Sequence, residues 1–319
     1  MVTGGSGYIG SQLISRLHGQ YDIVILDWEE PPASIAQLVI EKHIFDIAVP
    51  ESWAEIGKCD FVFHAAAQTS AVASEENPVR DFLSNVCGSF FVAEYARKYS
   101  AKVIYCNSVR VYDIAAVHEA IKKYGMVSED CPTIDISDRS PKMIPPFALS
   151  KNVGEQYLWL YAQKYGIKVI SHRMSGIVGP SQIGSQKHAW LSYLVECAVK
   201  GTEYTIYGKG NQTRDVLHID DFLDLIELEL KNFDHFAEKG FAFYNVGGGT
   251  SNKLSIKEVI RLLKEKHKLN LLHERTDFRQ GEPRHYATNL TRIAKRGWYP
   301  KHNNPEKIIA ELVEWHRRK

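Results

Sequence analysis

A glycine-rich run close to the start of the chain limits its fold more than any other feature. Residues 4–10 read Gly-Gly-Ser-Gly-Tyr-Ile-Gly, and the last six match the pattern G-x-G-x-x-G. Glycines at this spacing permit a tight turn from a strand into a helix and let backbone N–H groups approach a pyrophosphate. We therefore expect a dinucleotide-binding turn, whose contributing residues are Gly4, Gly7, Tyr8, Ile9 and Gly10.

An acidic residue at the end of the next apolar run supports this interpretation. Asp27 lies seventeen residues after Gly10, where a carboxylate can accept hydrogen bonds from the adenosine ribose hydroxyls. Trp28, Glu29 and Glu30 follow, and the sequence places no Lys or Arg beside them to hold a 2′-phosphate. The pattern favours NAD over NADP as the cofactor.

Continuous apolar runs alternate with helical segments through the first half of the chain. Such runs are typical of parallel strands buried on both faces, and the alternation predicts an α/β Rossmann fold with a doubly wound parallel sheet. Only three residues precede the glycines, so either the first strand is unusually short or the native start lies upstream of Met1. The expected strands are 21–27, 60–66, 102–108 and 168–174, and the expected helices include 81–99 and 147–165.

The pattern also predicts how the chain divides. Residues 1–174 should form the NAD-binding Rossmann domain, with a proline-containing excursion at 113–146 that covers a site. Residues 175–319 should form a smaller substrate-binding lobe, with about 209–250 returning to the first domain. In this lobe Ser255 and Glu258 predict a capping box, and a last helix should start at Pro305.

Composition excludes several classes of function. The chain has 39 Lys+Arg and 38 Asp+Glu, so it has no field that attracts nucleic acid or a membrane surface. No apolar run approaches the ~18–20 residues needed to span a bilayer, and the N-terminus does not resemble a signal peptide. Five scattered cysteines without Cys-x-x-Cys fit reduced thiols in a cytoplasmic protein. The thirteen histidines show no ligand spacing, so we expect no metal site.

Three further motifs resemble the extended short-chain dehydrogenase/reductase family, which contains NAD-dependent nucleotide-sugar epimerases and dehydratases. They are His64-Ala-Ala-Ala-Gln68, Ser108-x-x-Val-Tyr112 and Phe147-x-x-x-Lys151. The resemblance implies cofactor contacts from Ala65, Ala66, Ala67 and Asn85, with Asp46 and Ile47 on the third strand at the adenine ring. It implies a structural role for His64. It also implies a homodimer through helices 81–99 and 147–165.

The second half of the chain is most similar to the subgroup of CDP-paratose (CDP-tyvelose) 2-epimerases. The matching segments are 212–221, 244–248, 279–284 and 297–300. The resemblance implies a CDP-linked sugar as substrate, with Arg214 and Arg279 on its pyrophosphate and Arg284 at the sugar or at a carboxylate. Residues 186–190 would contact the nucleotide, while His218 is expected to be structural.

Phe147 departs from the family pattern at the catalytic position. The family uses a Tyr there as acid and base, a Lys four residues later, and a Ser or Thr that orients the sugar hydroxyl; Lys151 and Ser108 match the last two. A phenyl ring cannot accept a proton. An engineered Tyr→Phe trap, natural divergence, and a base supplied by substrate or water each explain Phe147, and a non-catalytic binding protein is the alternative function. Val109-Arg110 replace the Asp-Glu of the 4,6-dehydratases, and the Cys of the 3,5-epimerases is missing, so epimerisation is favoured over both.

Overall fold

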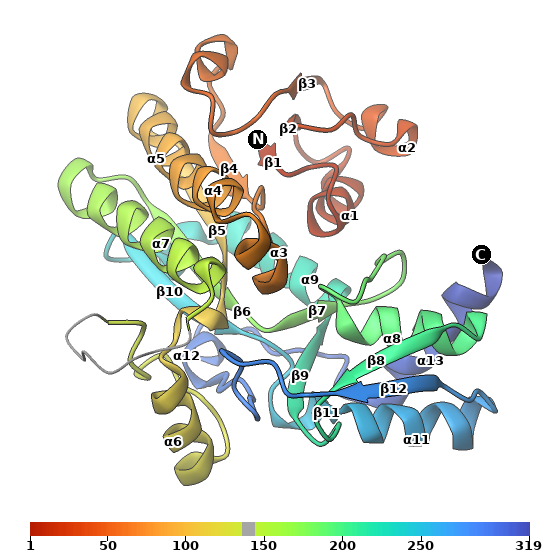
Figure 1. Ribbon diagram of the computed structural model, residues 1–319. Coiled ribbons are helices and arrows are strands. Elements are labelled where there is room, and N and C mark those ends of the chain that lie inside the picture. Colours follow the sequence, from red (N-terminus) through yellow and green to blue (C-terminus); the bar gives the residue numbers. More distant parts are fainter. Residues whose placement is uncertain (136–143) are drawn as a thin grey trace. The chain divides into compact units, whose positions relative to one another are not determined.

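The structure is a computed structural model that describes residues 1–135 and 144–319, and its largest sheet has seven strands (Figure 1). Its strand order is β10-β6-β5-β4-β1-β2-β3, and the pairings β3-β2, β2-β1, β1-β4 and β4-β5 are parallel. The predicted α/β doubly wound fold is confirmed. The strands are β1 (Val2–Thr3), β2 (Val24–Asp27), β3 (Glu41–Ile44), β4 (Phe61–His64), β5 (Lys102–Ser108), β6 (Val169–Met174) and β10 (Phe241–Val246).

The central strand β1 is only two residues long. Val2 pairs with Ile25 of β2 on one side and with Phe63 of β4 on the other, and the Met1 amine donates to the Phe61 carbonyl over 2.8 Å. A cavity of about 490 Å³ lies at this amino end of β1. Its apolar lining comes from neighbouring strands and helices and includes Leu13, Leu17, Ile23, Val24, Ile40, Val62, Ile104, Ile226 and Leu230.

The expected helix 81–99 is interrupted. α4 (Pro78–Phe82) leads into a π-helical turn η2 (Leu83–Cys87), and α5 (Gly88–Tyr99) follows without a break in direction. A π-turn inserts one extra residue per turn and is not visible in a hydrophobic pattern of period 3.6. α7 (Pro146–Tyr165) matches the other expected helix and packs against α5, as Figure 1 shows.

Two smaller sheets complete the strands, with orders β11-β9-β7 and β12-β8. Ser255 and Glu258 form the predicted capping box at the start of α11, and α13 begins at Pro305 as expected. The remaining elements are α1 (Tyr8–Leu17), α2 (Ala33–Ala36), η1 (Pro50–Glu55), α3 (Ala71–Glu76), η3 (Val109–Val111), α6 (Ile114–Tyr124), β7 (Gly176–Val178), α8 (Trp190–Lys200), β8 (Glu203–Tyr207), β9 (Thr213–His218), α9 (Ile219–Lys231), α10 (Phe233–Phe236), η4 (Thr250–Asn252), β11 (Lys253–Ser255), α11 (Ile256–His267), β12 (Leu272–Thr276), α12 (Thr291–Ala294) and α13 (Pro305–Arg318).

The chain forms two compact units. The first contains Met1–Val111, Pro145–Arg173 and Ile226–Tyr244, and the second contains Tyr112–Ile144, Met174–Leu225 and Asn245–Lys319. The segment that returns to the first unit is therefore shorter than the expected 209–250.

The expected excursion 113–146 does not stay with the first unit. Its described residues 113–135 belong to the second unit, where buried polar contacts hold them, while Pro145 and Pro146 belong to the first. Tyr112 donates to Asn245 Oδ1 over 2.6 Å, and Glu129 Oε1 accepts from the Asn245 backbone over 2.9 Å. Residues 136–143 of the excursion lie outside the described residues.

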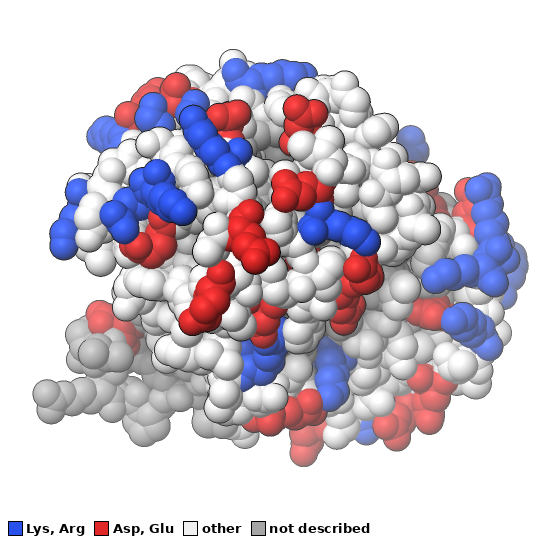
Figure 2. Space-filling view, turned by 90° about the horizontal axis from the view of Figure 1, so that it is seen from above, with Lys and Arg blue, Asp and Glu red and all other residues white. Residues whose placement is uncertain are grey.

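The surface carries charges of both signs. Figure 2 shows acidic and basic side chains interspersed over the face seen from above, as expected for a chain with 39 Lys+Arg and 38 Asp+Glu. Within residues 1–135 and 144–319, no helix has the length and apolar character that crossing a bilayer requires.

Candidate functional site

The glycine run forms a close-packed turn between β1 and α1. Gly4 has a φ of +72°, and a Cβ added to it would lie 2.6 Å from the Ala66 backbone nitrogen. A Cβ on Gly10 would lie 2.2 Å from the Gly4 carbonyl oxygen. α1 then begins at Tyr8, and its N-cap residue Gly7 offers no side chain to the free N–H groups. Such an uncapped helix start beside a glycine turn fits a pyrophosphate.

Asp27 lies at the carboxyl end of β2, as the sequence predicts, and is buried. Its carboxylate accepts hydrogen bonds from the backbone N–H groups of Ser6 (2.8 Å) and Glu29 (3.1 Å). The acid is therefore oriented by the glycine turn itself. Each carboxylate oxygen keeps a second lone pair that can accept from a ribose hydroxyl.

Asp46 and Ile47 follow β3 rather than lying on it, because β3 ends at Ile44. Ile47 is buried, while Asp46 forms an ion pair with Arg80 of α4. Arg80 also stacks on Trp28, with Cζ 3.8 Å from the ring centroid. The sequence shows no cation near Asp27, but the fold brings Arg80 to this stretch and pairs Lys42 with Glu30 over 2.7 Å. The sequence did not predict that Arg80 and Lys42 would lie here, because each is on a different segment from the residues it contacts.

Lys151 is buried on α7, and its Nζ donates to the Cys106 carbonyl of β5 over 2.6 Å. Burial lowers the pKa of this amine to about 8, although the acidic groups Asp81 and Glu155 oppose the shift. Lys151 is therefore mostly protonated at neutral pH. The contact fixes α7 against the end of β5, whose last residue is Ser108.

Asn85 stands in the π-turn η2 at the centre of a buried network. The two N–H groups of its amide are shared among three acceptors, the Gln68 carbonyl (3.1 Å), Asp81 Oδ1 (3.0 Å) and Ser150 Oγ (3.0 Å), and its Oδ1 accepts from the Gln68 backbone over 2.9 Å. Ser150 in turn donates to the Phe147 carbonyl over 3.1 Å. Asn85 therefore links the loop after β4 to the first turn of α7.

Phe147 and Ser108 supply no base in this structure. Phe147 is buried at the start of α7, and its backbone N–H donates to Ser74 Oγ over 3.1 Å. Ser108 Oγ accepts from the Arg110 backbone over 3.2 Å, which makes the hydroxyl a better donor and a poorer base.

His64 is structural, as expected. Its ring bonds to Thr3 Oγ1 (2.9 Å) and Ser89 Oγ (3.1 Å) and stacks on Tyr105. Burial, and secondarily the charge of Lys151, lower its pKa to about 3, so the ring is neutral. The neutral ring supports the loop Ala65–Ala67 without adding charge there.

In the second unit, Arg214 and the segment of Arg284 lie together. Arg214 donates to the Pro283 carbonyl (2.6 Å) and the Arg284 carbonyl (3.3 Å), and its Nη2 lies 3.4 Å from Glu282 Oε2. The side chain of Arg284 reaches Phe278, with Cζ 5.8 Å from its ring. The fold thus joins two motifs that lie about seventy residues apart in the chain.

Arg279 forms a second arginine position in this unit. It donates to the Gln186 carbonyl over 2.9 Å and stacks on Tyr207, with Cζ 3.6 Å from the ring. Gln186 also donates to the Thr205 carbonyl over 2.8 Å. The expected nucleotide segment 186–190 is therefore tied to β8 and to Arg279.

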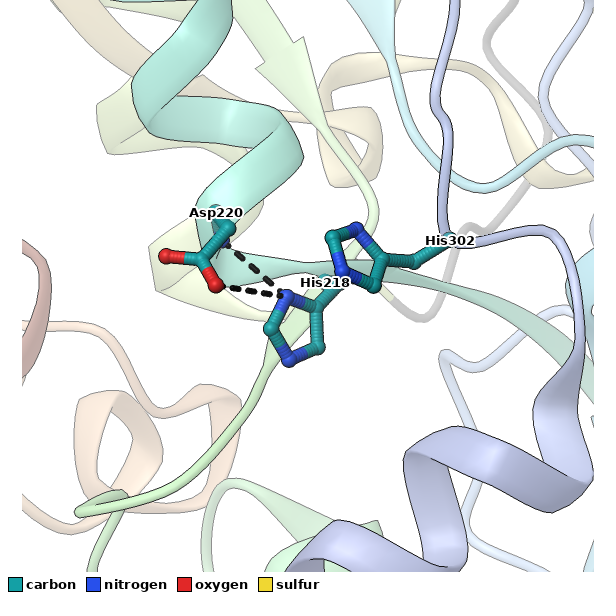
Figure 3. A group of neighbouring side chains, drawn as sticks. All are labelled: His218, Asp220 and His302. Carbon is teal, nitrogen blue, oxygen red and sulfur yellow. Dashed lines mark hydrogen bonds and ion pairs between the residues drawn. The ribbon is translucent and has the colours of Figure 1, made fainter.

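One cluster of possible metal ligands occurs among the described residues: His218, Asp220 and His302 (Figure 3). The two rings stack with centroids 4.2 Å apart, so their in-plane lone pairs do not converge on one point. His218 Nδ1 accepts from the Asp220 backbone over 3.2 Å, and His302 Nδ1 lies 3.0 Å from Asp221 Oδ1. These contacts explain the cluster as a structural link between the end of β9 and the segment before α13. The spacing of histidines in the sequence did not predict it, because His302 lies far after His218 in the chain.

Comparison with known proteins agrees with this geometry. Residues 1–247 match the model of the NAD dependent epimerase/dehydratase family. The CDP-paratose 2-epimerase of Salmonella typhi is 26% identical over 350 residues, covering 99% of this chain and 98% of that protein. A UDP-glucose 4-epimerase from Lactobacillus helveticus is 25% identical over 338 residues, covering 99% and 96%.

A solved structure shows the same fold. The UDP-glucose 4-epimerase of Thermus thermophilus in complex with NAD has a TM-score of 0.84 and 24% identity, covering 99% of this chain and 98% of that one. The glycine turn and Asp27 fit the cofactor of the family, and NAD is the cofactor of this protein. The chain belongs to the NAD-dependent epimerase/dehydratase family.

Proposed function

We propose that this protein binds a nucleotide-linked sugar, with CDP favoured, and is built on the plan of a CDP-sugar 2-epimerase whose catalytic Tyr is replaced by Phe147. In this proposal the first unit holds NAD through Gly4–Gly10 and Asp27, and the second unit holds the nucleotide. The similarity to the Salmonella typhi enzyme over 99% of the chain supports the choice of CDP.

The observation that carries the proposal is the position of Lys151. Its buried amine is fixed to the end of β5 one helical turn after Phe147, and Ser108 follows two residues beyond the Cys106 carbonyl that it holds. Burial disfavours its charge, and in this proposal the cation acts at the cofactor and substrate.

Epimerisation through a keto sugar needs a hydride acceptor and a proton acceptor. When bound, NAD supplies the first by accepting the hydride and returning it to the opposite face of the sugar. Ser108 would orient the sugar hydroxyl by donating a hydrogen bond, and the charge of Lys151 would hold the nicotinamide ribose. A Tyr at 147 would take the hydroxyl proton; the phenyl ring of Phe147 has no atom that can do so.

Arg214, Arg279 and Arg284 are proposed to bind the nucleotide and sugar, because a guanidinium pairs with phosphate oxygens at two points. Calorimetry with CDP, UDP, GDP and dTDP should show one preferred ligand, with CDP expected. Arg214→Ala or Arg279→Ala should weaken its binding tenfold or more, consistent with ~1.5–3 kcal/mol for a charge-assisted contact. Arg275→Ala, which removes an exposed arginine from β12, is the matched control and should bind as the parent does. Equal binding of all four nucleotides would contradict a specific pocket.

A second candidate function is non-catalytic binding of NAD and a nucleotide sugar. Phe147 favours it directly, since the residue is buried and its ring carries no ionisable atom. Restoring the hydroxyl by Phe147→Tyr separates the two functions, because a pocket that has diverged beyond the lost oxygen will not regain turnover.

We also propose a homodimer formed through α4, α5 and α7. α4, the adjoining turn η2 and α7 expose several large apolar side chains, and exposed patches of this kind mark association surfaces. Trp159→Glu should convert the dimer to a monomer in light scattering; a parent protein that is already monomeric would contradict the proposal. The exposed residues are Val79, Phe82, Leu83, Leu149, Tyr157, Trp159, Leu160 and Tyr165.

A further inference from the structure

A buried ion pair joins α7 to β6 one helical turn beyond Lys151. Glu155 lies four residues after Lys151, so the two side chains share one face of α7, and both are buried. Arg173 of β6 donates to Glu155 Oε2 through Nη2 over 2.6 Å, and its Nε–H is shared between both carboxylate oxygens at 3.2 Å. Ser171 Oγ donates to Glu155 Oε1 over 2.6 Å. Donors from β6 therefore hold both oxygens of the carboxylate.

The strand β6 carries a second buried acid on its opposite face. Successive side chains of a strand point to opposite faces, so Ser171 and Arg173 face α7 while His172 faces the other way. His172 Nε2 lies 2.7 Å from Glu229 Oε1, and neither side chain is exposed to solvent. Glu155 and Glu229 are thus buried carboxylates on opposite faces of one strand, and Glu155 is the one on the side of Lys151.

Three ionisable groups around Lys151 are neutral near pH 7. The ammonium lies 4.3 Å from the Tyr105 ring and donates to the Cys106 carbonyl. Burial raises the pKa of Tyr105, and it raises the pKa of the Cys106 thiol to about 12. Burial, and secondarily the charge of Lys151, lower the pKa of His64 to about 3. None of these groups supplies a negative charge to the amine.

Two carboxylates do act on the amine, Asp81 of α4 and Glu155, and both favour its charged form. Burial raises the pKa of Asp81, so the charge of Asp81 is itself disfavoured. Glu155 instead has the Arg173 guanidinium on its carboxylate, and an opposite charge at this distance favours the ionised form of an acid. Glu155 is therefore the more dependable counter-charge for Lys151.

We infer that Glu155 is a positioning residue for Lys151, which fixes this turn of α7 against β6 and supplies the negative charge that keeps the buried amine protonated. The inference rests on the proposed function, in which the charge of Lys151 holds the nicotinamide ribose. Glu155 would then extend to higher pH the range over which the cofactor is held, without touching the cofactor itself.

Unfolding experiments on the full chain test the inference without any ligand. Urea unfolding from pH 6 to 10 compares each protein with its own Lys151→Met variant. In the parent, the stability gained by Lys151→Met begins to fall as pH rises through about 8, because folded Lys151 then releases a proton that the unfolded chain keeps. Glu155→Gln retains the shape of the side chain and removes its charge, so this fall should begin about one pH unit lower.

Two further variants separate charge from packing. Glu155→Asp keeps the charge but shortens the reach to Arg173, so it should lower the melting temperature and leave the onset of the fall near that of the parent. Glu229→Gln is the matched control, because it removes a buried carboxylate from the opposite face of β6. It should also lower stability without moving the onset.

The pH at which the fall begins decides the inference. If Glu155→Gln does not fold because Arg173 lacks its partner, Glu155→Gln/Arg173→Met places two neutral side chains there and should show the same shift. An onset at the parent pH in these variants would overturn the inference and leave the ion pair with a packing role alone. An equal shift in Glu229→Gln would also overturn it, because the effect would not depend on the face that carries Lys151.

Calorimetry with NAD distinguishes a failure of this inference from a failure of the proposed function. NAD binding by the parent should weaken above about pH 8, and Glu155→Gln should bind NAD about fivefold more weakly than the parent at pH 8, as a pKa lower by one unit requires. If the unfolding onset shifts but NAD affinity is independent of pH in both proteins, Glu155 acts on Lys151 as inferred and the role of Lys151 at the cofactor is wrong. If NAD binding weakens at the same pH in both proteins and the onset is unchanged, the role of Lys151 stands and the inference fails.

Discussion

Lys151 Nζ donates a 2.6 Å hydrogen bond to the carbonyl oxygen of Cys106, and this contact joins α7 to β5 inside the first unit. The ammonium also lies 4.3 Å from the centroid of the Tyr105 ring. Burial nevertheless lowers its pKa from 10.5 to about 8. Lys151 therefore carries its positive charge at a buried position that disfavours the charged form of the amine.

This pKa predicts a specific pH dependence of stability. Between pH 8 and 10.5 the unfolded chain keeps a proton that folded Lys151 has released, so folding becomes more favourable as pH rises through that window. Lys151→Met should be more stable than the parent at pH 7, and the difference should shrink by about 2 kcal/mol by pH 9.5. Urea unfolding of both proteins at the two pH values measures it. A difference independent of pH would show that the amine titrates normally.

Asp27 should contribute directly to cofactor affinity. Its carboxylate is held by two backbone N–H groups and keeps lone pairs for ribose hydroxyls. Asp27→Ala should weaken NAD binding by ~1–3 kcal/mol, the typical effect of leaving buried polar groups unpaired. Calorimetry measures the loss, and Glu29→Gln, which removes a neighbouring exposed charge, is the control. Unchanged affinity in Asp27→Ala would mean that the ribose lies elsewhere.

Gly10→Ala should abolish most NAD binding. The added Cβ would lie 2.2 Å from the Gly4 carbonyl oxygen, which is backbone and cannot move without opening the turn. We expect at least a tenfold loss of affinity, with less effect on the helix content seen by circular dichroism. Gly57→Ala is the matched control, because a Cβ there meets no atom within 4 Å. Equal binding by both variants would contradict the role of the turn.

Local patterns predicted much of this fold and part of the site. Strand 102–108, the start of α13 at Pro305 and the capping box of Ser255 and Glu258 depend on neighbouring residues and are confirmed. Asp27 was recognisable because a glycine turn and the next strand end lie at a fixed spacing. The roles assigned to Ser108, Phe147, Lys151 and the three arginines remain predictions.

Features that depend on contacts between distant segments could not be predicted in this way. The stacking of Arg80 on Trp28 joins α4 to the end of β2, and the pairing of His218 with His302 joins β9 to the segment before α13. The π-turn at Leu83–Cys87 places Asn85 where it bonds to Gln68 and Ser150, which lie on other segments. In each case the deciding partner lies on another element, so no local spacing carries the signal.

Whether Phe147 blocks catalysis is tested most directly by the rate of sugar-nucleotide turnover of the Phe147→Tyr variant relative to the parent. General acid–base catalysis is worth ~10²–10⁴-fold, so the variant should turn over its preferred CDP-, UDP-, GDP- or dTDP-linked hexose at least ~10²-fold faster, with NADH absorbance and epimerised product followed by NMR. Lys151 Nζ is engaged with the Cys106 carbonyl and Ser108 Oγ accepts the Arg110 N–H, so neither is expected to replace the missing base. A parent protein that is already as fast as Phe147→Tyr would contradict the mechanism. No turnover by either form with any of these substrates would favour the non-catalytic binding protein.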